Sequence, residues 1–313
     1  MTSRDPIKAT QLPAVAVVVT YRRPQLATQV VKGLIEREGF APENIILVVN
    51  GEGGLADVAL QERLDVVKLP DNLGPAGGFN AGIRRFVEGF DQEWVYLCED
   101  DVGLFNLPTP RVQQVLDRLE RTQLSSSEKW PAAVVAYGRD LNRRTGITTV
   151  HDPAGSSGFV PVDVAPWGAS LVSRAVFESG ATPDDDWFFG YEDFDFWLKV
   201  HEAGFPVLLD VEAARSATET AFGSGRDAAF QGVRPDDETE PWRAYYVARN
   251  FLELARRHGH IGWTAWHLAK SVRRWQLGSR QARKATVAGL KDGFLRRMGR
   301  NDAYVRTVGE ISS

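Results

Sequence analysis

Three adjacent acidic residues, Glu99, Asp100 and Asp101, follow the apolar run Trp94–Cys98. Neighbouring carboxylates repel one another unless a cation lies between them. At the carboxyl end of a parallel strand they would face the crevice in which α/β sheets bind ligands. Hard oxygen ligands in that place suit Mg²⁺ or Mn²⁺, which can bridge a diphosphate. A solvated acidic turn is the alternative, and the buried strand that precedes the cluster favours the cation site.

A second pair of acids, Glu192 and Asp193, lies in the aromatic segment FFGYEDFDFW, residues 188–197. Ionised carboxylates beside so much aromatic surface are costly unless they are paired or used. Partial desolvation raises the pKa of a carboxyl group towards neutral, which suits a general base. The alternative for Asp193 is a structural one, because an aspartate at a helix start can serve as an N-cap alone.

A glycine-rich segment, DNLGPAGGFNAG at residues 71–82, follows a predicted strand and leads into a predicted helix. Glycine permits close approach of the backbone to a ligand, and a helix N-terminus favours anions. The segment matches neither GxGxxG nor GxxxxGK[ST], so it does not indicate a Rossmann or P-loop site. A ligand-binding loop and a plain turn both remain open.

The elements that must position these residues alternate along the chain. Short apolar, β-branched runs predict buried strands at Ala14–Thr20, Ile45–Val49, Val66–Leu69 and Trp94–Cys98. Because helix-like or glycine-rich segments separate them, we expect an α/β fold with a mostly parallel sheet over residues 14–137. Further expectations are strands at Trp167–Ser173 and Val207–Leu209, a helix at Phe194–Ala203, loops over 121–131 and 138–165, and a mobile loop at Ala213–Glu240.

Composition narrows the class of protein. The 313 residues are 43% hydrophobic and 25% charged, which excludes a collagen, a coiled coil or wholesale disorder. The single cysteine, Cys98, excludes an intramolecular disulfide and a cysteine-based zinc site. No apolar run of signal-peptide length lies near the start, and no stretch of 18 apolar residues occurs. We therefore expect a cytoplasmic protein without a membrane-spanning helix.

The net charge of −4 conceals a strong asymmetry. Residues 243–300 hold 14 Lys and Arg against 2 acidic residues, so the rest of the chain is acidic. A helical pattern runs from Trp242 to about Met298, which predicts a catalytic domain at 1–241 and a basic helical extension at 242–313.

Basic residues alternate with Trp and Leu over residues 256–284. This pattern fits a helix that lies on an anionic membrane, on the inner face if the protein is cytoplasmic. The alternative is a packed helical pair with a solvated basic face. We find no nucleic-acid-binding motif and expect no such partner. No pattern indicates an oligomeric state.

Six motifs occur together in one order: VVVTYRRP, DNLGPAGGFNAG, CEDD, WGASLVSRAVF, FFGYEDFDFWLKVHEAG and YYVARN. In this order, over about residues 14–255, the chain resembles family 2 glycosyltransferases with the GT-A fold. The nearest subgroup is that of bacterial rhamnosyl- and galactofuranosyltransferases of cell-envelope assembly. The resemblance implies a nucleotide-binding sheet flanked by helices. It also implies inverting, metal-dependent sugar transfer from a UDP- or dTDP-linked donor to a hydroxyl of a glycan or lipid-linked acceptor.

The resemblance also assigns roles to residues. Glu99 and Asp101 would hold Mn²⁺ or Mg²⁺, and Asp193, beside Glu192, would be the general base. The positions that would line the nucleotide-sugar are Thr20, Tyr21, Asn50, Asn72, Gly74, Asn80, Asp100, Trp167 and Gly168. Arg249 and Asn250 are typical of the subgroup, with no role assigned.

Two departures from the family pattern stand out. Asn50 occupies a position at which members usually carry an acid against the base, which leaves base selectivity open. Members often supply a histidine to the metal after the strand near residue 210, but residues 202–257 contain none. Either Thr218 or Glu219 takes the place of this histidine, or the metal site uses fewer protein ligands.

Two other functions stay open. A sugar nucleotidyltransferase would also use strand-end carboxylates and a metal. It would place a glycine-rich loop with Lys or Arg after the first strand, and here Arg22 and Arg23 are present without the glycines. The second alternative is a glycosyltransferase-like binding protein without activity, which the missing histidine and acid would explain.

Overall fold

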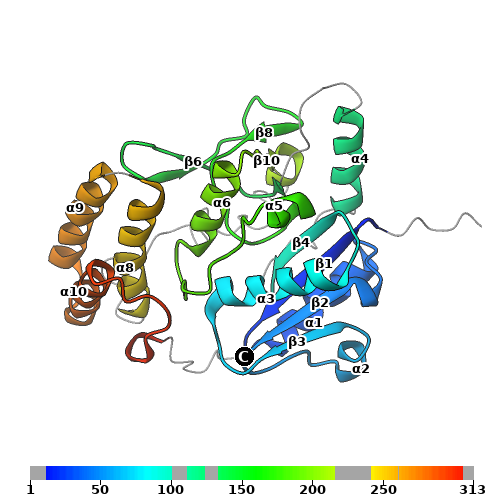
Figure 1. The fold of residues 1–313 in the computed structure, drawn as a ribbon, viewed down its shortest axis with the longest axis horizontal. Helices are drawn as coiled ribbons and strands as arrows, with labels where there is room; N and C mark the ends of the chain where they lie inside the picture. Colours follow the sequence, from blue (N-terminus) through cyan, green and yellow to red (C-terminus); the bar gives the residue numbers. More distant parts are fainter. Residues whose placement is uncertain (1–11, 101–110, 124–132, 216–240, 260, 306–313) are drawn as a thin grey trace, which may run out of the picture.

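A computed structural model describes residues 12–100, 111–123, 133–215, 241–259 and 261–305. Its centre is one mixed sheet with the strand order β3-β2-β1-β4-β9-β5-β10-β8 (Figure 1). The strands of this sheet are β1 (Ala14–Thr20), β2 (Ile45–Asn50), β3 (Asp65–Leu69), β4 (Trp94–Glu99), β5 (Ala133–Val135), β8 (Phe159–Pro161), β9 (Ser170–Ser173) and β10 (Val207–Asp210). A separate hairpin pairs β6 (Arg139–Leu141) with β7 (Thr148–Val150).

Strands β3, β2, β1 and β4 run parallel to one another. Strand β9 runs antiparallel to both β4 and β5, β10 runs parallel to β5, and β8 closes the far edge antiparallel to β10. The predicted α/β architecture with a mostly parallel sheet is therefore confirmed. Its carboxyl edge brings together the chain ends that follow β1, β2 and β4.

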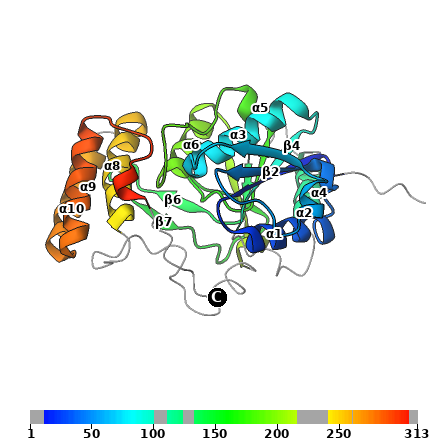
Figure 2. The same cartoon turned by 90° about the horizontal axis from the view of Figure 1, so that it is seen from below.

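Helices cover both faces of the sheet (Figure 2). They are α1 (Pro24–Glu36), α2 (Val58–Gln61), α3 (Gly74–Gly89), α4 (Arg111–Gln123), α5 (Arg174–Glu178), α6 (Glu192–Glu202), α8 (Pro241–His258), α9 (Ile261–Leu277) and α10 (Arg280–Phe294), with short 3₁₀ turns at Pro42–Asn44 and Asp302–Tyr304. No helix in these described ranges is long and apolar enough to cross a membrane.

Alternation along β1 produces two separate cores. Val17 points to the face that α3 covers and packs in one cluster with Phe79. Val18 points to the opposite face and packs in another cluster with Val31 and Leu34 of α1. Successive strand side chains point to opposite faces, so a run of apolar residues buried on both sides needs helices on both sides.

The C-terminal helices form a layer beside the sheet domain. Phe251 of α8 and Trp263 of α9 join the core on the α3 side of the sheet. Helix α10 packs closely on α8, because a Cβ at Gly289 would overlap the backbone carbonyl of Tyr245. The helical extension is thus confirmed, and the domain boundary at residues 241 and 242 stays a prediction.

Several sequence-based boundaries were wrong. The supposed loop over 138–165 contains β6, β7 and β8, whose three residues each are too few to show a periodicity. The strand predicted from Trp167 begins at Ser170, after Ala169 with a left-handed φ of 58°. Residues 121–123 end α4, and residues 211–215 are helical; residues 124–131 and 216–240 lie outside the described part.

Candidate functional site

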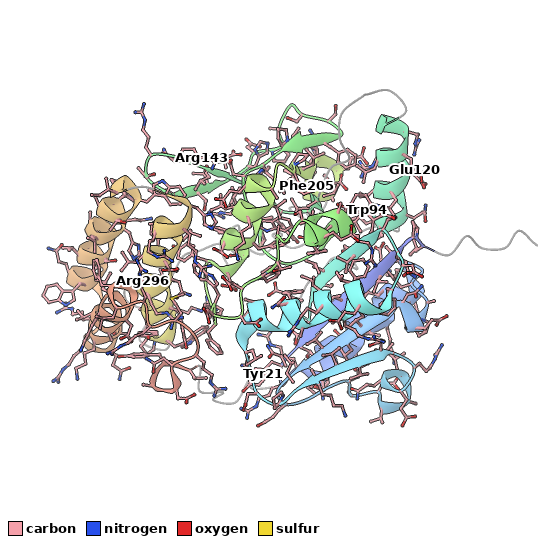
Figure 3. All side chains as sticks on the ribbon, viewed as in Figure 1. Tyr21, Trp94, Glu120, Arg143, Phe205 and Arg296 are labelled. Atoms are coloured by element: carbon pink, nitrogen blue, oxygen red, sulfur yellow. The ribbon has the colours of Figure 1, made fainter. Side chains whose placement is uncertain are left out.

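A cavity of about 320 Å³ opens at the carboxyl edge of the sheet. Figure 3 labels Tyr21 at this edge and Trp94 at the other end of the sheet. On the sheet side the lining includes Thr20, Tyr21, Asn50, Asn72, Gly74, Phe79, Glu99 and Asp100. On the other side it includes Phe188, Phe189, Trp242, Arg243 and Val305. Seven of the predicted site residues therefore surround one hollow.

Asp100 joins the ends of β4 and β1. Its carboxylate accepts hydrogen bonds from Thr20 Oγ1 at 2.8 Å and from Arg23 Nη1 at 3.0 Å. Asp100 and Thr20 are buried, where hydrogen bonds from a cation and a hydroxyl offset the desolvation of a carboxylate. Asp100 is thus held in place at the cavity wall.

Asn50 anchors the glycine-rich segment. Its Nδ2 donates to the carbonyl of Gly74 at 2.8 Å, and its Oδ1 accepts the amide of Leu73 at 2.9 Å. An aspartate could accept from Leu73 but could not donate to Gly74. This accounts physically for the amide at a position where an acid was expected. Asn72 adds a third bond, because its Oδ1 accepts the amide of Gly74 at 2.9 Å.

Gly74 is required by a close contact between two backbones. Its φ is +76°, a conformation that favours glycine, and a Cβ would overlap the carbonyl of Phe188. The contact brings the glycine-rich segment against residues 188–191, which lead into α6. Gly74 is therefore needed for the packing of these two segments, independently of any ligand that the neighbouring residues bind.

Burial dominates the electrostatics of the second acidic cluster. Glu192 opens α6 and is 6% exposed. Desolvation raises the pKa of Glu192 well above its ordinary value, and the charges of Asp193 and Glu99 raise it further. Because the charge of Glu99 acts on Glu192, the end of β4 and the start of α6 lie within electrostatic range of each other, although they are distant in sequence.

The pKa of Asp193 is subject to a different balance of effects from that of Glu192. Desolvation raises its pKa to about 7, while hydrogen bonding by the Phe194 amide and the charge of Arg139 act in the opposite direction. The Phe194 amide lies 2.8 Å from Asp193 Oδ1. Asp193 is therefore partly ionised at neutral pH, and the pKa of Glu192 is raised in the same direction, which favours its neutral form. The N-cap interpretation of Asp193 was wrong, because Tyr191 occupies that position with a φ of 69°.

Arg249 and Asn250 support the turn before this acid pair. The buried Asn250 donates through Nδ2 to the carbonyls of Phe189 at 2.7 Å and Gly190 at 2.9 Å. Its Oδ1 accepts Arg249 Nε at 2.7 Å. Gly190 and Tyr191 both have left-handed backbones, so these hydrogen bonds stabilise a turn that is unfavourable for an isolated chain.

The other predicted residues, Glu192 and Asp193 among them, are not part of the cavity lining. Asn80 donates to Asp185 at 2.7 Å. Trp167, with Gly168 next to it, is buried and stacks between Phe79 and Phe196 at centroid distances of 4.7 and 5.2 Å. Asp101, Thr218 and Glu219 lie outside the described residues.

Sequence reasoning missed one wall of the cavity. Phe189 meets Trp242 edge to face at 4.5 Å between ring centroids, and the Arg243 guanidinium lies 5.2 Å from the Trp242 ring. Trp242 Nε1 is buried and has no acceptor among the described residues. The adjacent aromatic residues Phe188 and Phe189 were the only hint of this wall in the sequence. Trp242, against which Phe189 packs, is 53 residues further along the chain.

The acidic donors suit a cation that is shared with a ligand. No three His, Cys, Asp or Glu side chains converge as metal ligands within the described ranges. Glu99 lines the cavity, while Asp100 is bonded to Thr20 and Arg23. Mg²⁺ is usually held by one or two carboxylates together with substrate phosphates. Glu99, which is the described member of the predicted pair, suits that arrangement better than a cage made of protein alone.

Asn250→Ala tests the support of the turn. It removes the donor from two carbonyls, and we expect a loss of about 1–3 kcal/mol in the free energy of unfolding, measured in urea. Asn44→Ala is the control, because Asn44 is also buried but accepts only one long bond of 3.3 Å from Gln92. Equal losses in the two variants would contradict the assigned role of Asn250.

No protein-family model and no curated protein sequence matches the chain. Among solved structures, it is similar to the mannosyltransferase PcManGT from Pyrobaculum calidifontis in complex with GDP-Man and Mn²⁺, with 13% identity and a TM-score of 0.47 over 91% of this chain and 77% of that one. It is also similar to GalNAc-T7 with UDP, GalNAc and Mn²⁺, with 13% identity and a TM-score of 0.46 over 84% of this chain and 55% of that one. At these scores, the two similarities decide neither the donor nor the reaction of this chain.

Proposed function

We propose that the chain is an inverting glycosyltransferase that moves a sugar from a nucleoside-diphosphate sugar to a hydroxyl acceptor. The observation that supports this best is that one acidic cluster lines the cavity and a second lies within its electrostatic reach. Burial raises the pKa of Glu192, the charge of Asp193 raises it further, and so does the charge of Glu99, which lines the cavity. A carboxylate suited to a cation and an acid pair suited to proton transfer are the two groups this reaction needs.

The donor is proposed to bind along the sheet side of the cavity. Thr20, Tyr21, Asn50 and Asn72 would contact the nucleotide, Asp100 and Gly74 would shape the wall, and Asn80, Trp167 and Gly168 would support the sugar end from behind. A UDP- or dTDP-linked galactofuranose or rhamnose is the donor that the family resemblance favours. Mn²⁺ or Mg²⁺, held by Glu99 and Asp101, would offset the charge that develops on the leaving diphosphate.

Asp193 is proposed as the general base. Its carboxylate takes the proton of the acceptor hydroxyl as that oxygen forms a bond to the anomeric carbon. The bond from this carbon to the diphosphate oxygen breaks on the opposite side, so the configuration inverts. Burial raises the pKa of the neighbouring Glu192, and the charges of Asp193 and Glu99 raise it further, which favours the neutral form of Glu192. The Arg139 charge holds down the pKa of Asp193, which keeps part of its population ionised at neutral pH.

The aromatic wall suits a glycan acceptor. Sugar rings have apolar faces and polar edges, and this wall combines rings with donors in Trp242 and Arg243. The nucleotidyltransferase alternative is weaker, because the two arginines that would bind phosphates in such an enzyme, Arg22 and Arg23, form ion pairs with acidic side chains. Arg22 Nε donates to Glu52 at 2.8 Å, and Arg23 pairs with Asp100 at 3.0 Å.

Asp193→Asn tests the base directly. The amide cannot accept the proton, so we expect transfer to fall about 10²–10⁴-fold while the donor still binds. Product formation and donor binding should be measured separately. Asp186→Asn, an exposed position on the segment before α6, is the matched control and should retain normal turnover. Near-normal transfer by the Asp193 variant would refute the assignment.

The pH profile provides a second test. Asp193 must be ionised to act, and its pKa is raised to about 7 by burial. The rate should therefore fall below pH 7, about tenfold per pH unit, instead of below the ~3.9 of an ordinary aspartate. Donor affinity measured across the same range separates binding from chemistry. A turnover number that is constant from pH 5 to pH 8 would contradict this role for Asp193.

A further inference from the structure

Helix α9 exposes apolar side chains to solvent. Its buried residues Trp263, His267 and Ser271 recur every four positions and face the rest of the protein. On the opposite side, Ile261 is 86% exposed and Val272 is 56% exposed. Burial on a single stripe is normal for a surface helix, but the other stripe is normally polar. Figure 1 shows α9 and α10 at the edge of the molecule, on the far side of α8 from the sheet.

Helix α10 continues this surface with a mixed composition. Its small residues face α8, while Val287 and Phe294 are 53% and 62% exposed. Beside them on the helix, within about 80° of the helical wheel, lie Arg280, Lys284 and Lys291, all exposed. Apolar and basic side chains therefore alternate on the outer face of α10.

One arginine shows that the two faces adjoin. The Arg283 guanidinium of α10 lies 5.5 Å from the ring centroid of Trp275 on α9. It also donates to the carbonyls of Gly278 at 2.9 Å and Gln276 at 3.1 Å. Trp275 is 47% exposed and lies within about 60° of Ile261 and Val272 on the helical wheel. We call the surface of Ile261, Val272, Trp275, Val287 and Phe294, with the basic residues beside them, the α9–α10 face.

The charge around this face is almost entirely positive. Residues 261–297 contain nine Lys and Arg and a single acid, Asp292. That acid is engaged, because it accepts Tyr245 Oη at 2.7 Å and pairs with Arg297 at 3.6 Å. Exposed apolar side chains next to exposed basic side chains match an anionic lipid bilayer, which has an apolar interior and a negatively charged surface.

We propose that the α9–α10 face docks on the surface of an anionic lipid bilayer. Trp275 and Phe294 enter the boundary between head groups and acyl chains, while Lys284 and Lys291 contact lipid phosphates. The helices lie on the membrane, and no described helix crosses it. Docking does not depend on sugar transfer. If both hold, the acceptor is lipid-linked, because α8, on which α9 and α10 pack, begins at the cavity with Trp242.

Vesicle co-sedimentation of the full chain tests the proposal. Vesicles of phosphatidylcholine with 30 mol% phosphatidylglycerol should bind the protein at low salt, and pure phosphatidylcholine at least tenfold less. Raising the salt to about 0.5 M should weaken binding strongly, because screening shortens the reach of surface charge. A chain that fails to bind anionic vesicles at low salt would overturn the proposal.

Variants separate the two parts of the face. Trp275→Ala with Phe294→Ala should reduce vesicle binding at least tenfold, and Lys284→Glu with Lys291→Glu should abolish its salt dependence. All four side chains are exposed, so the melting temperature should hardly change. Matched controls are the exposed Val58→Ala and Lys68→Glu, which should bind normally.

Self-association is the competing explanation for the face. If the chain is a dimer that Trp275→Ala with Phe294→Ala converts to monomers, without any effect on vesicle binding, the face is an interface between copies and the proposal is wrong. Vesicle binding requires no nucleotide-sugar, so its outcome is independent of the transfer assay.

Discussion

Burial of carboxylates at the carboxyl edge of the sheet is the constraint on which this structure depends. For Asp100, hydrogen bonds from Thr20 and Arg23 offset the cost of desolvating the carboxylate. For Glu192 and Asp193, desolvation disfavours the charged form and so raises the pKa. The pKa of Asp193 is raised to about 7, and a carboxyl group that ionises near neutral pH is suited to proton transfer.

The C-terminal helices, which lie beside the sheet, help to position the acid pair and to form the cavity wall. Asn250 of α8 fixes the turn that delivers Glu192 and Asp193, and the carbonyl of Phe188 meets Gly74 where no side chain would fit. Trp242, at the start of the same helix, closes the cavity. The extension is therefore part of the candidate site. Its inner side holds the acid pair and its outer side is the α9–α10 face.

Local patterns predicted much of the fold, and seven of the residues singled out in the sequence line one cavity. The seven residues of β1, six of them apolar, were predicted with correct bounds, because a buried strand of that length needs no tertiary information. The use of Asn50 as an anchor could not be predicted, since its partners Leu73 and Gly74 lie more than 20 residues on. The same holds for the pairing of Phe189 with Trp242. The basic bias at the C-terminus was visible in the sequence, but which of its apolar side chains are exposed depends on how α8, α9 and α10 pack.

The proposed function requires the cavity to bind a nucleoside diphosphate together with a divalent cation at Glu99. Titration calorimetry with UDP, dTDP and GDP, in Mn²⁺ and in EDTA, measures this binding. We expect at least one of the three nucleotides to bind in Mn²⁺, EDTA to weaken this binding at least tenfold, and Glu99→Gln to have a similar effect. Nucleotide binding of equal strength with and without the cation, or none from any nucleotide in Mn²⁺, would contradict the proposed function.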